Sequence, residues 1–343
     1  MPPILLAVPN ISEGRDRETI AALARAFADQ TPPPRKEARA SGAAAAGAAA
    51  ADAAADAGAT PAAAPAVRLL DTHTDRDHHR TVFTLAGPPG ALARALLRGA
   101  RVAVERIDVV ARAGGPAEGI GQHPHVGAVD VAPIVHLDPA DRGAACAEAL
   151  VLADMLGAQL GLPVFLYGEL TAGEGTPART RAQLRRGGLA GLAARMAGAG
   201  QPAERPLAPD FGPPRMHPSA GATLVAARPP LVAFNLQLAP PAGIEQARAI
   251  AAQIREGGEH GLPGLRAIGV ALDGGLAQVS MNVERPGELP LARVVAAVRE
   301  RAPLHSAELV GLAPAAAFAG FPGDLPIPGF DPARHLIENA LSC

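Results

Sequence analysis

The chain has 343 residues, of which 48% are hydrophobic, and a formal net charge of −2 at pH 7. This length allows one large domain or two smaller ones, and the apolar content is sufficient for a core. Because positive and negative residues are interspersed, the sequence has no basic face, which argues against nucleic acid or an anionic membrane surface as a partner. We therefore expect small molecules as ligands.

The cysteines and the N-terminus indicate where the protein resides. Cys146 lies within an apolar helical pattern and Cys343 is the last residue, a spacing that predicts neither a metal site nor a disulfide framework. The N-terminal MPPILLAVPN lacks the pattern of a secretory signal, and no stretch has about 18 consecutive apolar residues. We therefore expect a soluble cytoplasmic protein.

The apolar periodicity of the first half predicts alternating strands and helices. Residues 4–12, ILLAVPNIS, predict a buried strand that runs into a turn, and Asp16 can cap a helix that follows it to about Gln30. Further elements are expected as strands at 67–73 and 81–87, a helix at 91–107, a strand at 128–137, a helix from about 138 to 160 and a strand at 162–167. The order β-α-β-β-α-β, followed by α-β, predicts a ferredoxin-like arrangement with an extension.

A low-complexity tract interrupts this pattern. Residues 31–66 are rich in alanine and proline, and their small side chains cannot offset the entropy of ordering a packed element. Alanine favours a transient helix around 43–57, but such a helix would have no apolar stripe with which to dock. We therefore predict a disordered insertion.

The second half repeats the alternation of the first. Residues 176–200 predict a helical connector, and a proline-rich segment that fits neither a helix nor a strand follows it. We place the boundary there, between an N-terminal subdomain at 1–205 and a C-terminal subdomain at 206–343. Elements of the second unit are expected as strands at 222–227 and 230–238, a helix at 243–256, strands at 264–272 and 276–283, a helix at 289–301 and a strand at 305–311.

The fold class is therefore α/β (α+β), with two ferredoxin-like subdomains whose mixed or antiparallel sheets are packed by helices. Two such units imply a cleft between them, which is a common place for a ligand.

The segment GQHPHVGAVD, residues 121–130, places two histidines on a Gly/Pro-bounded loop directly before a strong strand. Histidine changes its charge near physiological pH, and a loop held by a rigid strand can present it to a ligand. Three interpretations of His123 and His125 fit: a catalytic base, one edge of a metal site, or loop residues without a role. Pro124 weakens the metal interpretation, because that argument requires a strand in which positions two apart point the same way.

A second polar cluster, DTHTDRDHHRTV, lies between two expected strands and contains Asp71, His73, Asp75, His78 and Arg80, among other polar residues. It could bind a divalent metal or be a solvated hairpin connection, and no HExxH or DxDxDG spacing favours the metal. Asp71 and Arg80 flank the strand ends, where a carboxylate could orient an imidazole and a guanidinium could bind a substrate carboxylate.

Two further features lie in the second half. The segment PDFGPPRMHPSAGAT is either a linker or a ligand-lining loop, whose glycines allow close backbone approach and whose prolines hold its shape. Asn235 stands in the otherwise apolar strand LVAFNLQL, and a buried amide needs partners, either from the protein or from a polar heterocycle.

Taken together, these segments resemble the formiminotransferase domain family. The resemblance is carried in order by VPNISEGR, LLDTHTDRDHHRTVFTLAG, GQHPHVGAVDVAPI, LPVFLYGE, PDFGPPRMHPSAGAT, LVAFNLQL and ELVGLAP. It implies two α/β subdomains that enclose a folate tunnel, and transfer of a formimidoyl group from N-formimino-L-glutamate to tetrahydrofolate in histidine degradation. It also implies a homodimer, and the reaction requires no metal.

The resemblance assigns roles to residues of this sequence. The family's catalytic histidine corresponds to His123, which we expect to act as the general base. Asp71, Arg80 and Asn235 are candidates for orienting the base or binding substrate. The residues expected to contact folate are Gly212, Pro213, Pro214, Arg215, Met216, His217, Pro218, Ser219, Ala220 and Gly221.

The sequence departs from the family pattern at three positions, where Gln122, His125 and His79 stand in place of the usual Glu, Arg and Asn. These changes near the base leave open a formyl-group transferase that acts on N-formyl-glutamate. Two alternatives of other classes also remain. One is a metal-dependent hydrolase with His73, Asp75, His78, His123 and His125 as ligands, and the other is a catalytically silent folate-binding protein.

Overall fold

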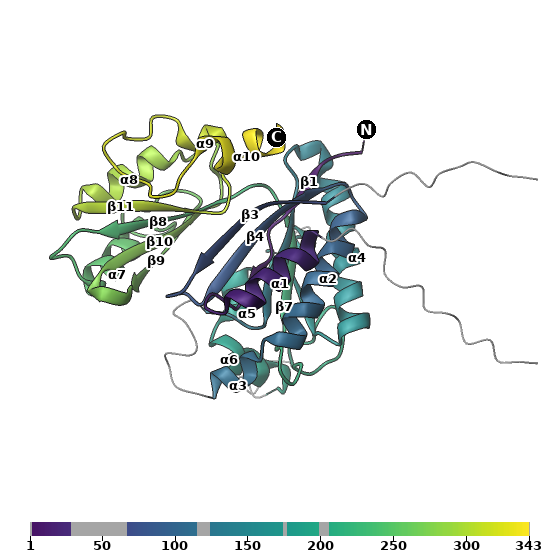
Figure 1. Ribbon diagram of the computed structural model, residues 1–343. Helices are drawn as coiled ribbons and strands as arrows, with labels where there is room; N and C mark the ends of the chain where they lie inside the picture. Colours follow the sequence, from purple (N-terminus) through teal and green to yellow (C-terminus); the bar gives the residue numbers. More distant parts are fainter. Residues whose placement is uncertain (1, 29–66, 115–123, 174–176, 199–205, 343) are drawn as a thin grey trace, which may run out of the picture.

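The computed structural model describes residues 2–28, 67–114, 124–173, 177–198 and 206–342. Two sheets organise these residues, each covered by helices (Figure 1). The expected insertion at 31–66 lies outside the described residues, as does His123.

The first sheet is mixed and contains seven strands within the described residues. They are β1 (Leu5–Ala7), β2 (Asn10–Ile11), β3 (Arg68–Asp75), β4 (Arg80–Gly87), β5 (Val129–Val135), β6 (Val164–Gly168) and β7 (Thr223–Arg228). β1 and β2 are two pieces of the expected strand 4–12, and both lie between β4 and β5, antiparallel to each. With β3 beside β4, the order β5, β1/β2, β4, β3 is ferredoxin-like, as predicted.

The extension of this sheet corrects one expectation. β7 runs parallel to β5 on one side and to β6 on the other, so it belongs to the first sheet. The strand expected at 222–227 is therefore not part of the second unit, although it lies beyond the predicted boundary at 205/206. Because the apolar run of a strand buried on both faces does not reveal its neighbours, periodicity could not make this assignment.

Three helices cover the outer face of the first sheet (Figure 1): α1 (Arg17–Ala28), α2 (Ala91–Arg106) and α4 (Arg142–Leu160). Phe27 of α1 packs on Phe83 of β4 with ring centroids 4.9 Å apart. The buried carboxylate of Glu148 in α4 accepts hydrogen bonds from the backbone N–H groups of Gly90 and Ala93 at the start of α2. This carboxylate satisfies two of the donors that a helix N-terminus leaves unpaired.

Helix α4 is preceded by a short 3₁₀ turn, η2 (Pro139–Asp141), which Asp138 caps. Among the described residues, the stretch Pro139–Leu160 is the one helix long and apolar enough by composition to cross a membrane. Its residues Ala149, Leu152 and Leu156 belong to the core beneath the first sheet, which explains the apolar character.

The second sheet consists, within the described residues, of β8 (Val232–Leu238), β9 (Leu265–Ala271), β10 (Ala277–Val283) and β11 (Leu304–Val310). Its order, β11-β8-β10-β9, is antiparallel throughout and again ferredoxin-like. Helices α7 (Ile244–Ile254) and α8 (Leu291–Arg299) bury its apolar face, whose core includes Phe234, Leu236 and Val279.

Several short elements were not predicted individually. The expected connector at 176–200 contains α5 (Arg181–Arg185) and α6 (Gly188–Met196), and the expected loop at 108–127 contains α3 (Val109–Ala113). The remaining elements are η3 (Glu169–Thr171), η4 (Asp273–Gly275), η5 (Ala315–Phe318), α9 (Pro332–His335) and α10 (Ile337–Ser342). α10 returns to the first sheet, where Ile337 and Ala340 pack with Leu6 and Val135.

Candidate functional site

A cleft lies between the two sheets, with about 840 Å³ of empty space that includes volume open to solvent. β4 and β5 contribute Val82, Thr84 and Val131 from the first sheet. β8 and β10 contribute Asn235 and Ser280 from the second. Apolar walls with a few polar groups are typical of a small-molecule site.

Three arginines line this cleft: Arg80 at the start of β4, Arg181 at the start of α5 and Arg228 at the end of β7. Burial lowers the pKa of Arg80 and that of Arg228 to about 10, and it also lowers the pKa of Arg181. Guanidinium groups with such pKa values are still protonated at pH 7. The cleft therefore holds three positive charges on partly buried side chains.

A polar row crosses the second sheet on the face toward the cleft. Glu308, Asn235 and Ser280 are aligned on β11, β8 and β10. The Asn235 amide donates to Oε2 of Glu308 at 2.8 Å, and Nε2 of His73 lies 3.1 Å from Oε1. Burial raises the pKa of Glu308, but the hydrogen bonds from His73 and Asn235 outweigh burial and lower it. The His73 contact joins β3 of the first sheet to the second sheet.

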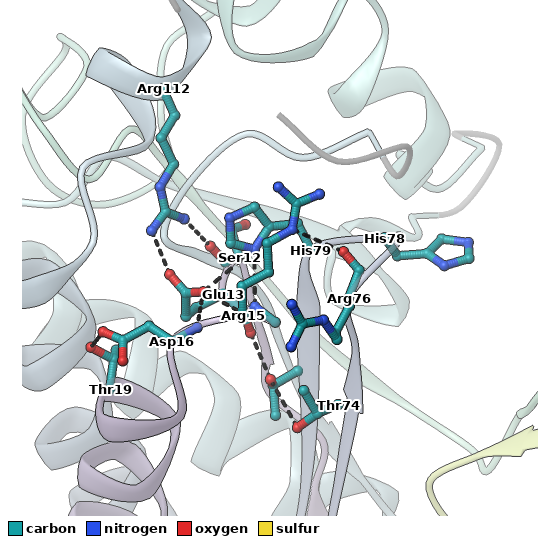
Figure 2. Close-up of polar contacts among 12 residues, drawn as sticks. Ser12, Glu13, Arg15, Asp16, Thr19, Thr74, Arg76, His78, His79 and Arg112 are labelled. Atoms are coloured by element: carbon teal, nitrogen blue, oxygen red, sulfur yellow. Dashed lines mark hydrogen bonds and ion pairs between the residues drawn. The ribbon is translucent and has the colours of Figure 1, made fainter. Parts of the chain in front are cut away.

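Beside the cleft, a buried carboxylate organises the turn after β2 (Figure 2). Glu13 is 2% exposed, accepts hydrogen bonds at 2.9 Å from the backbone N–H groups of Arg15 and Asp16, and pairs with Arg112. Burial by itself would raise the pKa of Glu13. The hydrogen bonds and the charge of Arg112 lower this pKa by more, so the carboxylate is charged. In Figure 2 the Arg112 side chain points toward Glu13, whereas His78 points away from this group.

His79 completes this cluster in an unusual backbone conformation. Its φ is 49°, in the left-handed region, which asparagine tolerates better than most residues with a side chain. Nδ1 of His79 accepts the backbone N–H of Gly14 at 3.0 Å and lies 3.5 Å from Oε1 of Glu13. Burial lowers the pKa of His79 to about 4, and charge on His125 contributes in the same direction, so His125 is within electrostatic range.

The loop that follows His123 is tightly held. Oδ1 of Asp130 accepts the backbone N–H of Val126 at 2.9 Å, and the same carboxylate forms a buried ion pair with Arg185 of α5. The Ser12 hydroxyl donates to the carbonyl of Gly127 at 2.7 Å. The backbone between Val126 and Asp130 is thus fixed from both sides.

The segment expected to contact folate packs against this loop. Gly127 and Gly221 form an antiparallel bridge, and the backbone N–H of Ala128 donates to the carbonyl of Ala220 at 2.9 Å. Within the segment, Nδ1 of His217 accepts the N–H of Ala220 at 3.0 Å. The structure therefore brings Ala220 and Gly221, at the end of this segment, beside the residues that follow His123, although the two regions lie about ninety positions apart in the sequence.

The other predicted residues are placed as follows. Arg80 and Asn235 line the cleft, as described above. Asp71 lies on β3, two positions before His73, and is opposite Thr84 of β4. Its side chain is partly buried. Its proposed orientation of His123 stays a prediction, because His123 lies outside the described residues.

The metal alternative has little support in the described part of the chain. No group of three His, Cys, Asp or Glu residues there could hold a metal ion. Of the expected ligands, His73 contacts Glu308, and Nδ1 of His78 pairs with Asp75. The expectation that no metal is required stays a prediction.

Sequence reasoning missed four residues that the structure brings into or beside the site: Glu13, Asp130, Arg181 and Arg228. Glu13 belongs to the segment VPNISEGR and Asp130 to GQHPHVGAVD. A charged residue beside an apolar strand indicates a buried pair, and this signal could have identified both. Arg181 and Arg228 had no local signal, because their significance comes from folding two distant segments around one cleft.

Comparison with known proteins gives a consistent result. The model of the formiminotransferase domain, N-terminal subdomain, matches residues 4–228, so the match ends where β7 ends. The chain is 34% identical over 283 residues to the glutamate formimidoyltransferase of Streptococcus pyogenes serotype M1, covering 80% of this chain and 89% of the relative. It is 29% identical over 314 residues to the glutamate formimidoyltransferase of Thermoplasma acidophilum, covering 90% of this chain and 87% of the relative. With the formimidoyltransferase-cyclodeaminase of Gallus gallus it shares 33% identity over 326 residues, which is 92% of this chain but 51% of the relative.

Proposed function

The chain belongs to the formiminotransferase domain family, an enzyme family of transferases, and we propose that it transfers the formimidoyl group of N-formimino-L-glutamate to tetrahydrofolate. The products are 5-formimidoyltetrahydrofolate and L-glutamate, a step that belongs to histidine degradation and one-carbon metabolism. A cytoplasmic homodimer is part of the same proposal. The observation that carries it is the cleft, which presents cationic and neutral polar groups together.

The residues around the cleft fit tetrahydrofolate as a cosubstrate. A reduced pterin offers several hydrogen-bond donors and acceptors on a flat ring, and it needs polar partners set in apolar walls. The cleft supplies the hydroxyl of Ser280 and the amide of Asn235 beside Val82 and Val131. Oγ1 of Thr84, which also lines the cleft, is buried without a hydrogen-bond partner in the described structure. A buried hydroxyl of this kind is a candidate ligand contact.

The reaction needs proton transfer rather than a protein nucleophile. N5 of tetrahydrofolate attacks the formimidoyl carbon, a tetrahedral intermediate forms, and the bond from that carbon to the glutamate nitrogen breaks. His123 would accept the proton of the attacking amine and return it to the leaving nitrogen, which typically contributes about 10²–10⁴-fold in rate. Holding both substrates in one cleft removes the entropic cost of a bimolecular encounter.

The neighbouring residues support these roles. Asp130, Ser12 and the 217–222 backbone hold the loop after His123, which favours a fixed position for a base. Gly212–Gly221 would contact folate, and Arg80 would bind a substrate carboxylate. Asp71 would orient His123 or tune its charge, and Asn235 would contact a substrate.

The test is to mix the protein with tetrahydrofolate and N-formimino-L-glutamate and to follow the absorbance of formimino- or methenyl-tetrahydrofolate. His123→Ala should abolish turnover and leave the affinity for tetrahydrofolate largely intact. His260→Ala, which changes an exposed histidine outside the cleft, is the matched control and should behave as wild type.

Other outcomes point to the alternatives. Turnover with N-formyl-L-glutamate alone would indicate the formyl-group transferase. Binding of tetrahydrofolate with no transfer from either donor would indicate a silent folate-binding protein. Activity that is lost on chelation, together with a stoichiometric bound metal, would indicate the metal-dependent hydrolase.

A further inference from the structure

The three cleft arginines form one cationic group, because all of them line the same cleft. The positive charge of Arg181 lowers the pKa of Arg80 and that of Arg228, so Arg181 lies within electrostatic range of both. We call Arg80, Arg181 and Arg228 the arginine row.

The row has no carboxylate partner among the described residues. The side chains of Arg80 and Arg181 make no hydrogen bond or ion pair there, while Nη1 of Arg228 donates to the carbonyl of Pro229 at 3.0 Å and its Nε is buried without a partner. These three side chains are partly buried, and guanidinium groups in such a setting are normally paired, because desolvating an unpaired charge is costly. The row is therefore incomplete without an anion.

The carboxylates that lie within electrostatic range of the arginine row already pair with other residues. Asp130 pairs with Arg185, and Asp75 pairs with His78. Glu284, which is within electrostatic range of Arg181 and Arg228, lies 3.3 Å from Nε of Arg266. Because these carboxylates have their own partners, the positive charge of the row is left to a ligand.

We propose that the arginine row binds the two carboxylates of a glutamyl group, with Arg181 as a specificity-determining residue. This rests on the proposed function, in which both substrates contain a glutamyl group: the donor and the tail of tetrahydrofolate. Three guanidinium groups in one cleft can receive two carboxylates at once. A ligand with one carboxylate would leave part of the row unpaired.

The experiment compares Arg181→Gln and Arg228→Gln with wild type by titration calorimetry. The probes are N-formimino-L-glutamate, tetrahydrofolate, and tetrahydropteroate, which lacks the glutamyl group. Arg186→Gln is the matched control, because Arg186 adjoins α5 but is exposed and does not line the cleft. Loss of a charged hydrogen bond should weaken glutamyl binding about ten- to a hundredfold.

Two results would support the proposal and identify the ligand. Weaker binding of N-formimino-L-glutamate with unchanged tetrahydrofolate affinity assigns the row to the donor. Weaker binding of tetrahydrofolate with unchanged tetrahydropteroate affinity assigns it to the folate tail. In either case Arg181→Lys should restore part of the affinity, because it retains the charge.

A stability measurement separates this role from a structural one. Arg181→Gln removes a partly buried charge that makes no hydrogen bond or ion pair within the described residues, so its melting temperature should equal or exceed that of wild type even as binding weakens. Unchanged affinity for both glutamyl ligands, or no binding of either to wild type, would overturn the proposal. Binding that depends on Arg181 without any group transfer would instead overturn only the proposed function.

Discussion

Asp130 and Arg185 form an ion pair in which both side chains are buried, 2% and 9% exposed. Asp130 also accepts the backbone N–H of Val126 at 2.9 Å. One carboxylate thus joins helix α5 to strand β5 and to the loop that follows His123. Any change at Asp130 affects the position of this loop as well as the charge balance of the cleft.

Replacing Asp130 with alanine should destabilise the protein strongly. The substitution leaves the Arg185 charge buried without its partner, which typically costs about 3–5 kcal/mol. Urea unfolding at pH 7, followed by circular dichroism, measures this loss. Turnover should also fall, because the N–H of Val126 loses its acceptor and the loop is less well fixed.

A double variant provides the control for this interpretation. Asp130→Leu combined with Arg185→Met removes both charges and keeps apolar volume, so it should lose much less stability than Asp130→Ala. Equal losses for the two variants would mean that packing, rather than the unpaired charge, controls stability at this site.

His79 should make stability dependent on pH between about 6.5 and 4. Its Nδ1 accepts the N–H of Gly14, which requires an unprotonated nitrogen, and burial lowers the pKa of His79 from 6.5 to about 4. As pH falls below 6.5, the unfolded state binds a proton at His79 that the folded state does not bind until about pH 4. The contribution of His79 to the free energy of unfolding is therefore fully present above pH 6.5. It is lost as the pH falls toward 4, by up to about 3 kcal/mol.

His79→Asn isolates this effect from other acidic groups such as Glu13. Asparagine tolerates the left-handed backbone, and its side-chain oxygen can accept the N–H of Gly14, but it does not titrate. Urea unfolding at pH 7, 5.5 and 4.5 should show a smaller loss of stability in this variant than in wild type. Parallel curves for the two proteins would show that His79 is not the titrating group.

Much of the fold could be predicted from the sequence, because apolar periodicity and capping act locally. Asp16 is predicted to cap a helix that runs to about Gln30, and its Oδ1 accepts the backbone N–H of Glu18 at 2.9 Å at the start of α1. The partner of β7 could not be predicted in this way. Pairing between β5 and β7 joins segments about ninety residues apart, and a uniformly apolar strand fits the interior of either sheet.

The candidate site was predicted where its residues share a motif. Arg80 and Asn235 were named from their local setting, and both line the cleft. Arg181 and Arg228 were not, since an arginine on a predicted helix or at a strand end is usually solvated. Their significance depends on two facts that sequence does not contain: which segments meet across the cleft, and which nearby carboxylates already have partners.

Gly127 provides a test of how the loop after His123 is coupled to the folate segment. A Cβ at this position would lie 1.8 Å from the carbonyl oxygen of Ala222 and 2.8 Å from that of Ala220. Gly127→Ala must therefore push the two segments apart, and such overpacking typically costs about 1–3 kcal/mol. Because Gly221 bridges to Gly127, we expect tetrahydrofolate to bind at least about tenfold more weakly, a loss equivalent to about 1.4 kcal/mol.

Gly143→Ala is the matched control for this substitution. Gly143 lies exposed in α4 with no atom within 4 Å of an added Cβ, so alanine should leave stability unchanged or raise it by up to about 1 kcal/mol. Urea unfolding and calorimetric titration with tetrahydrofolate measure both variants. If Gly127→Ala retained wild-type stability and affinity, contact between the two segments would not be needed for folate binding, and the assignment of Gly212–Gly221 to folate would lose its main structural support.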